Sequence, residues 1–264
     1  MSKATKIWLI AASVLVLCGA ILFFGVMAYL DWDFEKLSTV EYETNEHEIG
    51  EGFEDILVIT DTADIVFVKS ENEKTTVVCR EEKNGKHLVA VKDGVLIIKL
   101  EDTKSWYDHI GINFETSKIT VYLPEGEYGG LSVKLSTGDV DMSGGFAFED
   151  GICVDVSTGD VRFENITCKS LTSNGSTGDI RLKKVVAAEA FEIKRSTGDV
   201  TFDACDASVI SVKTATGDVE GSFISEKIVF AQTDTGRVNV PVSQAGGRCD
   251  IITDTGDIKI IIAK

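Results

Sequence analysis

The sequence has few of the side chains on which most enzyme and metal sites depend. Its 264 residues include only three histidines, His47, His87 and His109. None stands in a Ser-His-Asp arrangement or in the helical spacing typical of a metal site, so we expect all three on the surface or in loops. This scarcity argues against an enzyme. We predict no catalytic residues and no bound cofactor.

Positive charge is also scarce. The chain carries 26 lysines and arginines against 43 aspartates and glutamates, which gives a net charge of −17. Lys3 and Lys6 are the only charged residues among the first thirty, so the rest of the chain carries −19. A surface this acidic repels the phosphates of nucleic acid and of anionic lipid. We therefore exclude nucleic acid as a partner.

Cysteine is present without a recognisable pattern. Cys18 lies in an N-terminal apolar run, which leaves five others, at Cys79, Cys153, Cys168, Cys205 and Cys249. An odd number cannot pair completely, and the spacings match no zinc motif. The alternation described below places Cys249 inside as a small apolar filler. It places Cys153 outside, either as a reactive thiol or against a neighbouring loop.

One long apolar run stands at the N-terminus. Residues 7–30 contain no charge and are long enough, at about 36 Å as a helix, to cross a bilayer. Two lysines precede the run and acidic residues follow it, so residues 1–6 are expected in the cytoplasm and residues 31–264 outside. The alternative is a cleaved signal peptide. Against it, the run exceeds the usual core of about 7–15 residues and no Ala-x-Ala site closes it.

The second half of the chain repeats one short phrase, Ser-Thr-Gly-Asp-Val or a close variant, seven times. Its glycines are Gly138, Gly159, Gly178, Gly198, Gly217, Gly236 and Gly256. A period near twenty residues is typical of stacked repeats. Glycine at the centre reaches positive φ without penalty, and the aspartate beside it can accept backbone hydrogen bonds, so each phrase predicts a tight turn.

Side chains alternate on both sides of each turn. Positions seven and five before the glycine, and two and four after it, are mostly apolar, while the position three after it is polar in all seven repeats. This period of two predicts strand, turn, strand with one face buried, and hence an all-β fold. Two topologies fit, a β-solenoid with one coil per repeat or a meander of hairpins. The near-constant period favours the β-solenoid.

These patterns divide the chain. We expect a cytoplasmic tip (1–6), a transmembrane helix (7–30), an acidic juxtamembrane linker (31–52), an irregular β part that blocks one end of the stack (53–130), and the seven-repeat solenoid (131–264).

The last residues of the chain, 258–264, are rich in isoleucine. At the far end of a stack they would form a bare edge. We predict that this edge meets a partner or a second copy of the chain.

Stacking would bring the turn aspartates into one column, composed of Asp139, Asp160, Asp179, Asp199 and Asp218. Neighbours at about 4.8 Å repel by roughly 1 kcal/mol even in bulk water, so something must offset the charge. Either each carboxylate accepts amide hydrogen bonds from its own turn, with Arg237 breaking the column, or the column binds Ca²⁺, which prefers oxygen ligands.

A second candidate site is aromatic. Trp106, Tyr107 and His109 share one loop and could stack on a sugar or a protein partner. The alternative is that this loop packs over the end of the stack.

The turn phrases, the Asp61-Thr62-Ala63-Asp64-Ile65 segment and the strand that ends in Leu123-Pro124 resemble a bacterial family of proposed adhesins built from β-strand repeats, largely defined as a domain of unknown function. The resemblance covers roughly residues 53–264. It implies a β-solenoid on the outer face of a bacterial membrane and brings no catalytic residues. Some similar proteins are associated with envelope-stress signalling.

Together these observations predict a membrane-anchored, non-enzymatic surface module that binds an envelope protein or a cell-wall polymer. The alternative is a regulatory ectodomain in envelope-stress signalling. Because only six residues precede the apolar run, such an ectodomain would have to act through another membrane protein. An enzyme is the third and least favoured class, because identical repeats supply a surface and not the unequal acid and base that hydrolysis needs.

Overall fold

The computed structural model describes residues 2–33, 36, 40–102 and 116–263. Two units emerge, one formed by residues 1–41 with 104–115 and the other by residues 42–103 with 116–264. The predicted aromatic loop with Trp106, Tyr107 and His109 lies outside the described residues.

The first unit contains the helix α1 (Lys3–Tyr29). The Ser2 side chain caps it by accepting a hydrogen bond from the Thr5 amide at 3.2 Å. The apolar side chains of α1 are exposed around its circumference, with Trp8 at 76% and Leu15 at 72%. The predicted N-terminal apolar helix is therefore confirmed.

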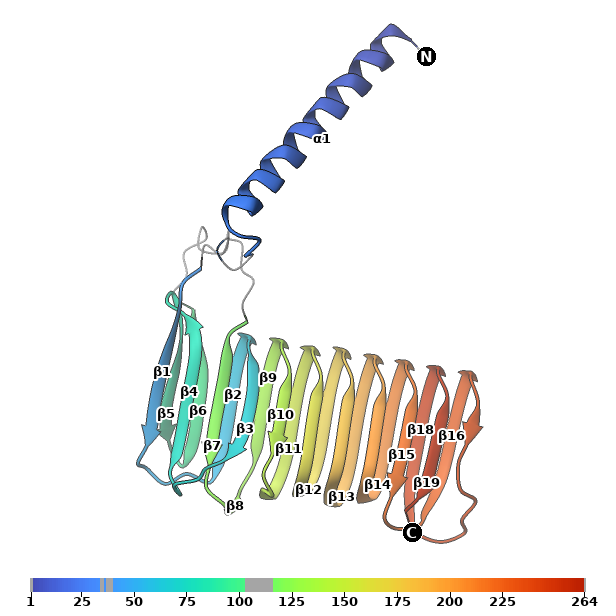
Figure 1. The fold of residues 1–264 in the computed structure, drawn as a ribbon. Helices are drawn as coiled ribbons and strands as arrows, with labels where there is room; N and C mark the ends of the chain where they lie inside the picture. Colours follow the sequence, from blue (N-terminus) through green and yellow to red (C-terminus); the bar gives the residue numbers. More distant parts are fainter. Residues whose placement is uncertain (1, 34–35, 37–39, 103–115, 264) are drawn as a thin grey trace. The chain divides into compact units, whose positions relative to one another are not determined.

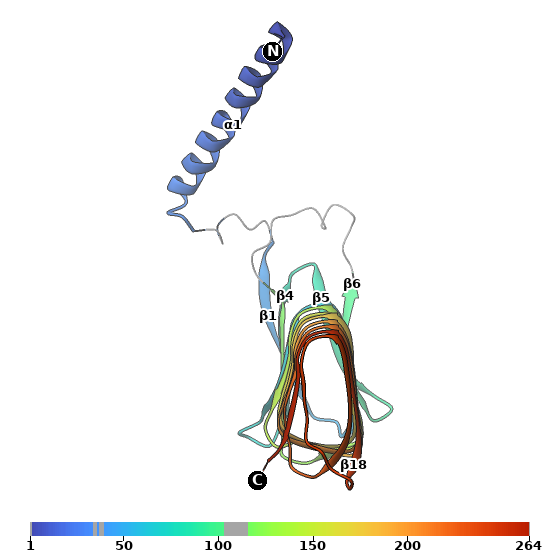
Figure 2. The same ribbon diagram turned by 90° about the vertical axis from the view of Figure 1, so that its right-hand side faces the viewer.

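The second unit is all-β, as predicted, and forms one 19-stranded sheet. The strands are β1 (Tyr42–Ile49), β2 (Asp55–Thr62), β3 (Asp64–Lys69), β4 (Thr75–Glu82), β5 (Gly85–Lys92), β6 (Val95–Asp102), β7 (Lys118–Leu123), β8 (Glu127–Tyr128), β9 (Leu131–Thr137), β10 (Val140–Ser143), β11 (Ala147–Thr158), β12 (Val161–Thr177), β13 (Ile180–Thr197), β14 (Val200–Thr216), β15 (Val219–Phe223), β16 (Lys227–Thr235), β17 (Val238–Asn239), β18 (Gly247–Thr255) and β19 (Ile258–Ile262). Seen along the stack, the sheet curls into a flattened and nearly closed barrel (Figure 2).

Two faces flank a row of corners; their strands are parallel except for the pairs β5–β6, β1–β4 and β4–β7, which are antiparallel. We call the face that leads into the corners the first face; its strand order is β5–β6–β2–β9–β11–β12–β13–β14–β18–β16. The second face leaves the corners and runs β1–β4–β7–β3–β10–β12–β13–β14–β15–β19–β17. Each repeat thus adds one strand to each face, and we call a repeat in its place in the stack a rung (Figure 1).

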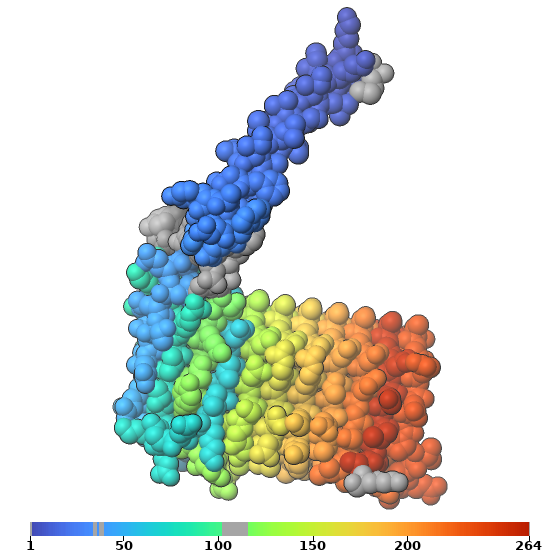
Figure 3. Space-filling model, viewed as in Figure 1, coloured from blue at the N-terminus to red at the C-terminus, as the bar shows by residue number. Residues whose placement is uncertain are grey.

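The order of the last two rungs differs from their order in the chain. Thr216 of the fifth repeat pairs with Thr255 of the seventh, and Thr255 pairs in turn with Thr235 of the sixth. In Figure 1 the dark red strands of the seventh repeat accordingly lie inside the stack, and β16 lies at its end. The space-filling view in Figure 3 shows the same dark red residues between orange-red ones. The seventh repeat has been inserted between the fifth and the sixth.

This insertion corrects the predicted bare edge at 258–264 in part. Ile258 and Lys259 of β19 pair with β15 on one side and with β17 on the other, whereas Ile260–Ile262 pair with β15 alone. That this edge meets a partner or a second copy of the chain stays a prediction. The terminal rung is the sixth repeat, and its inward positions are partly open. Val238 is 44% exposed, whereas its counterpart Ile258 in the adjacent rung is fully buried.

The remaining inward rows form one continuous core, as the alternation predicts. The row two residues after each glycine is fully buried at Val140, Val161, Ile180, Val200, Val219 and Ile258. Cys249 is buried in this core and Cys153 is half-buried on the first face, in agreement with their predicted directions. The described cysteines are all free thiols.

The segment before the repeats supplies the other end of the stack. Ala63 takes the corner position, because Thr62 pairs with Thr137 and the Ala63 amide donates to the Thr137 carbonyl at 3.1 Å. Strand β1 lies within the predicted linker of residues 31–52 and pairs antiparallel with β4. Residues 42–49 of the predicted linker are therefore part of the sheet.

Candidate functional site

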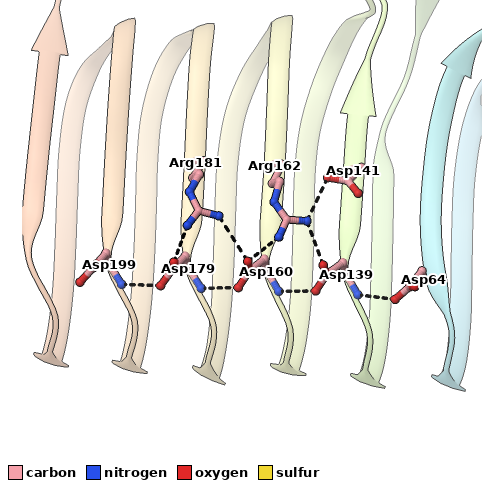
Figure 4. Close-up of polar contacts among 8 residues, drawn as sticks. All are labelled: Asp64, Asp139, Asp141, Asp160, Arg162, Asp179, Arg181 and Asp199. Atoms are coloured by element: carbon pink, nitrogen blue, oxygen red, sulfur yellow. Dashed lines mark hydrogen bonds and ion pairs between the residues drawn. The ribbon is translucent and has the colours of Figure 1, made fainter. Parts of the chain in front are cut away.

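A ladder of aspartates runs along the corners of the stack. Its members are Asp64, Asp139, Asp160, Asp179, Asp199, Asp218 and Asp257. In each step the Oδ1 atom of one aspartate accepts a hydrogen bond from the backbone amide of the next, at 2.7–3.0 Å. Figure 4 shows five of these residues and the dashed contacts between them.

The ladder corrects one sequence-based expectation. The predicted column exists, but each carboxylate accepts from the following rung and not from its own turn. A hydrogen bond between rungs couples neighbours, so the aspartates fasten the stack as well as shape the turns. Arg237 also does not break the column. It stands at its end, because the sixth repeat is the terminal rung.

Corner glycines let the rungs approach closely enough for this ladder. Gly178 has φ +129°, and a Cβ atom on it would lie 2.0 Å from the carbonyl oxygen of Gly159. The same near-2 Å approach recurs at the other corner glycines of the repeats. Ala63 is the first corner of the column. The next corner, Gly138, packs against the Ala63 carbonyl, whereas no corner glycine precedes Ala63, so Ala63 can carry a side chain.

Two arginines offset part of the negative charge. Arg162 reaches Asp139 Oδ2 at 2.8 Å and Asp160 Oδ2 at 2.5 Å, and Arg181 reaches Asp179 Oδ2 at 2.6 Å (Figure 4). Burial of Asp139 opposes its ionisation, but the Asp160 amide and the Arg162 guanidinium outweigh burial and hold the pKa of Asp139 below its usual value. The hydrogen bond between Arg162 and the Asp139 carboxylate likewise raises the pKa of Arg162. The arginines therefore occupy the positions that a cation would take at three of the five calcium candidates.

Two hollows lie on the first face. One, of about 380 Å³, is lined mainly by small and apolar residues, among them Leu57, Gly130, Ser132, Cys153 and Thr172. The other, of about 290 Å³, lies nearer the corners and is more polar than the first, with Lys134, Asp155 and Asn174 in its lining. Both cross strands β2, β9, β11 and β12, so a ligand in either would touch several rungs. Volumes near 300 Å³ are at the lower limit for small-molecule pockets.

The comparisons with known proteins agree with this fold. The profile of the family described as Toastrack DUF4097 matches residues 53–263. The chain belongs to the Toastrack DUF4097 family. The Toastrack match includes the seven repeats and the strands β2 to β8 that precede them. It confirms the predicted family of proposed adhesins of unknown function.

Solved structures similar to this Toastrack chain include a proposed adhesin of Bacteroides fragilis. It is 22% identical, with a TM-score of 0.58, and the match covers 84% of this chain and 97% of that one. A proposed adhesin of Parabacteroides distasonis is 12% identical with a TM-score of 0.43, covering 84% and 98%. A proposed cell adhesion protein of Clostridium sporogenes is 13% identical with a TM-score of 0.40, covering 85% and 100%. At these identities the first likeness establishes the fold. Comparison with curated proteins gave no match.

Sequence reasoning missed one polar cluster of this Toastrack domain. His87 was expected on the surface or in a loop, but it is only 6% exposed, and its ring contacts Glu81, which is 1% exposed. His47 lies half-buried on β1. The only sequence signal for the cluster is in β4, where the inward-facing positions change from the apolar Val77 to the charged Glu81.

Proposed function

We propose that the protein is a membrane-anchored, non-enzymatic β-solenoid of the cell envelope whose first face binds an extended polymer, either an envelope protein segment or a cell-wall glycan. The observation that carries this proposal is the pair of hollows that cross the same four strands of one face. Each is too open to enclose a compact substrate, but a chain lying along the strand direction of this face would meet both kinds of lining.

The chemistry of the two hollows supports a polymer ligand. Lys134, Asp155 and Asn174 offer donors and acceptors on successive rungs of the first face, and the Asn174 amide already donates to Asp155 at 2.9 Å. The neighbouring hollow offers apolar surface and backbone. Sugar rings and extended peptides both present alternating polar and apolar groups, so either can use this combination.

The helix α1 supports membrane anchoring. Its 27 residues span about 40 Å, and its exposed apolar side chains would be costly in water. Lys3 and Lys6 precede the apolar run and Asp31 and Asp33 follow it, which favours an outward orientation of the sheet. Mass spectrometry of the membrane-extracted protein tests this part: an intact N-terminus supports an anchor, and a chain that begins after residue 30 supports a cleaved signal.

Binding can be tested with the full chain in mild detergent against isolated cell wall and envelope extracts. Ser132→Trp would fill the apolar hollow, and Thr201→Trp on the second face is the matched control. We expect Ser132→Trp to weaken binding at least about tenfold, which corresponds to about 1.4 kcal/mol, and Thr201→Trp to bind as the wild type does. Equal binding by both variants would contradict the proposal. Stoichiometric co-purification of one membrane protein, without wall binding, would favour the regulatory alternative.

A further inference from the structure

The end of the stack opposite to β16 is closed by a seam between its two faces. β1 pairs with β4 on the second face, and β5 pairs with β6 on the first. The outer strands β1 and β5 are joined across the end by Lys86 Nζ and Glu43 Oε1, 2.6 Å apart. Beneath this seam the core is not wholly apolar, although Val89 and Val91 of β5 pack against it.

The core here includes a buried cluster of three potential metal ligands, Cys79 and Glu81 on β4 and His87 on β5. They are 0%, 1% and 6% exposed. The Cys79 sulfur, a Glu81 carboxylate oxygen and a ring nitrogen of His87 all lie within 4.8 Å of one another. Burying three such groups is costly unless each is bonded.

Neighbouring side chains hold two of the three ligands in place. Glu81 Oε2 accepts from the His87 amide at 2.7 Å and contacts His87 Nδ1 at 2.6 Å, while Glu81 Oε1 accepts from Asn45 at 2.8 Å. His87 Nε2 lies 2.9 Å from Thr60 Oγ1. A second polar group that contacts a ligating imidazole or carboxylate is typical of metal sites, because it fixes the orientation of the ligand.

We propose that Cys79, Glu81 and His87 form a structural zinc site that fastens the seam at this end of the stack. Zinc takes thiolate, imidazole and carboxylate ligands together, at about 2.0–2.3 Å, which sets ligand atoms roughly 3.5 Å apart. The Cys79 sulfur therefore needs to approach by at most about 1 Å, and His87 Nδ1 and Glu81 Oε2, which lie 2.6 Å apart, need to separate by about 1 Å. Asn45 and Thr60, which already contact Glu81 and His87, are placed to hold these two ligands from outside the coordination sphere, and water takes the fourth position.

Zinc binds His87 Nδ1 and Glu81 Oε2 in place of the proton that lies between them. That proton moves to His87 Nε2, so the imidazole stays neutral and its Nε2–H donates to Thr60 Oγ1. The Cys79 thiol loses its proton to solvent as the sulfur binds zinc. No electron is transferred, and no other reactant is needed. The bound metal joins β4 to β5 and thereby holds the two faces together.

The test uses the full chain without a polyhistidine tag, in detergent, loaded with Zn²⁺ or Co²⁺ and dialysed. We expect one equivalent of metal by elemental analysis, a thiolate-to-cobalt absorption band, and a higher melting temperature with Zn²⁺. Cys79→Ser should lose the band, and His87→Gln should bind at least tenfold more weakly. Cys249→Ser is the matched control, because Cys249 is an equally buried thiol outside the cluster. It should behave as the wild type does.

Protection of the Cys79 thiol from alkylation is a readout on the wild-type protein, so it does not require any variant to fold. Alkylation in partly denaturing buffer, followed by peptide mapping, should show Zn²⁺ slowing the reaction of Cys79 and leaving that of Cys249 unchanged. Wild-type protein without a stoichiometric metal, a cobalt band that survives Cys79→Ser, or equal protection of both cysteines would overturn the proposal.

Discussion

Arg237 and Asp257 form the last step of the aspartate ladder, although Arg237 comes first in the chain. The Arg237 amide donates to Asp257 Oδ1 at 2.8 Å, and its guanidinium reaches Asp257 Oδ2 at 2.6 Å. The side-chain hydrogen bond from Arg237, and after it the backbone hydrogen bond, hold the pKa of the Asp257 carboxyl below its usual value. The one repeat that lacks the corner aspartate is thus the one that has no following rung.

Replacing this arginine tests whether the end of the ladder needs a cation. Arg237→Asp would place a second carboxylate beside Asp257, and no further amide would neutralise it. We expect a lower urea midpoint than for Arg237→Gln, with the difference shrinking at high salt. A midpoint for Arg237→Asp at or above that of Arg237→Gln would show that the end of the ladder tolerates an uncompensated carboxylate.

A corner glycine should be far more sensitive to substitution than a glycine in an open turn. Gly178→Ala places its Cβ about 2.0 Å from the Gly159 carbonyl oxygen and strains a φ of +129°. We expect it to cost more than about 3 kcal/mol of unfolding free energy. Gly94→Ala is the control, since Gly94 also has positive φ but nothing within 4 Å, and it should cost about 1 kcal/mol. Urea unfolding of both variants measures the difference, and similar costs would contradict it.

The sequence was sufficient to predict the all-β fold, because alternation around seven equal turns leaves few other choices. It also placed Val140 and its equivalents inside and Cys153 outside. Rung order was not predicted, because the corner phrases of the fifth, sixth and seventh repeats are nearly interchangeable as strand partners. Two signals for it exist in hindsight: Arg237 in place of aspartate, and the serine- and glycine-containing stretch 240–247 that lets the chain return.

Two buried polar placements, those of Arg195 and of the cluster around His87, depend on contacts between residues far apart in the sequence. Arg195 belongs to an ordinary-looking strand, yet it is 4% exposed, and its guanidinium lies where a side chain on Gly175 would be. The cluster around His87 combines β2, β4 and β5, which no local spacing brings together. Such placements follow from the stack and cannot be read from any single repeat.

The aspartate ladder should make the folded protein less stable in acid. Because the pKa of Asp139 is lower in the folded state, its carboxylate stabilises the fold above the unfolded value of about 3.9 and loses that effect as pH falls through the folded pKa. Asp139→Asn should therefore be less stable than wild type at pH 7, and the gap should narrow below about pH 4. Asp203→Asn, at an exposed aspartate outside the ladder, is the control. A gap that widens in acid would contradict the assignment.

Calcium binding by Asp139, Asp160, Asp179, Asp199 and Asp218 stays a prediction, and the arginines sharpen it. Arg162 and Arg181 already contact the first three of these carboxylates. We expect the double variant Arg162→Gln/Arg181→Gln to bind Ca²⁺ more tightly than the wild type in calorimetry, because the competing cations are gone. If neither protein shows heat or a melting shift at millimolar Ca²⁺, the calcium hypothesis fails.

The order of the rungs is tested most directly by disulfide cross-linking at the corner threonines, with Cys18 and Cys153 replaced by serine. Paired strands lie about 4.8 Å apart, within disulfide reach, whereas positions two rungs apart lie near 9.6 Å and are out of reach. The inserted seventh repeat predicts that Thr216→Cys with Thr255→Cys, and Thr255→Cys with Thr235→Cys, form intramolecular disulfides on mild oxidation. Thr216→Cys with Thr235→Cys should remain reduced. Efficient cross-linking of this last pair, with none between 216 and 255, would mean that the repeats stack in chain order.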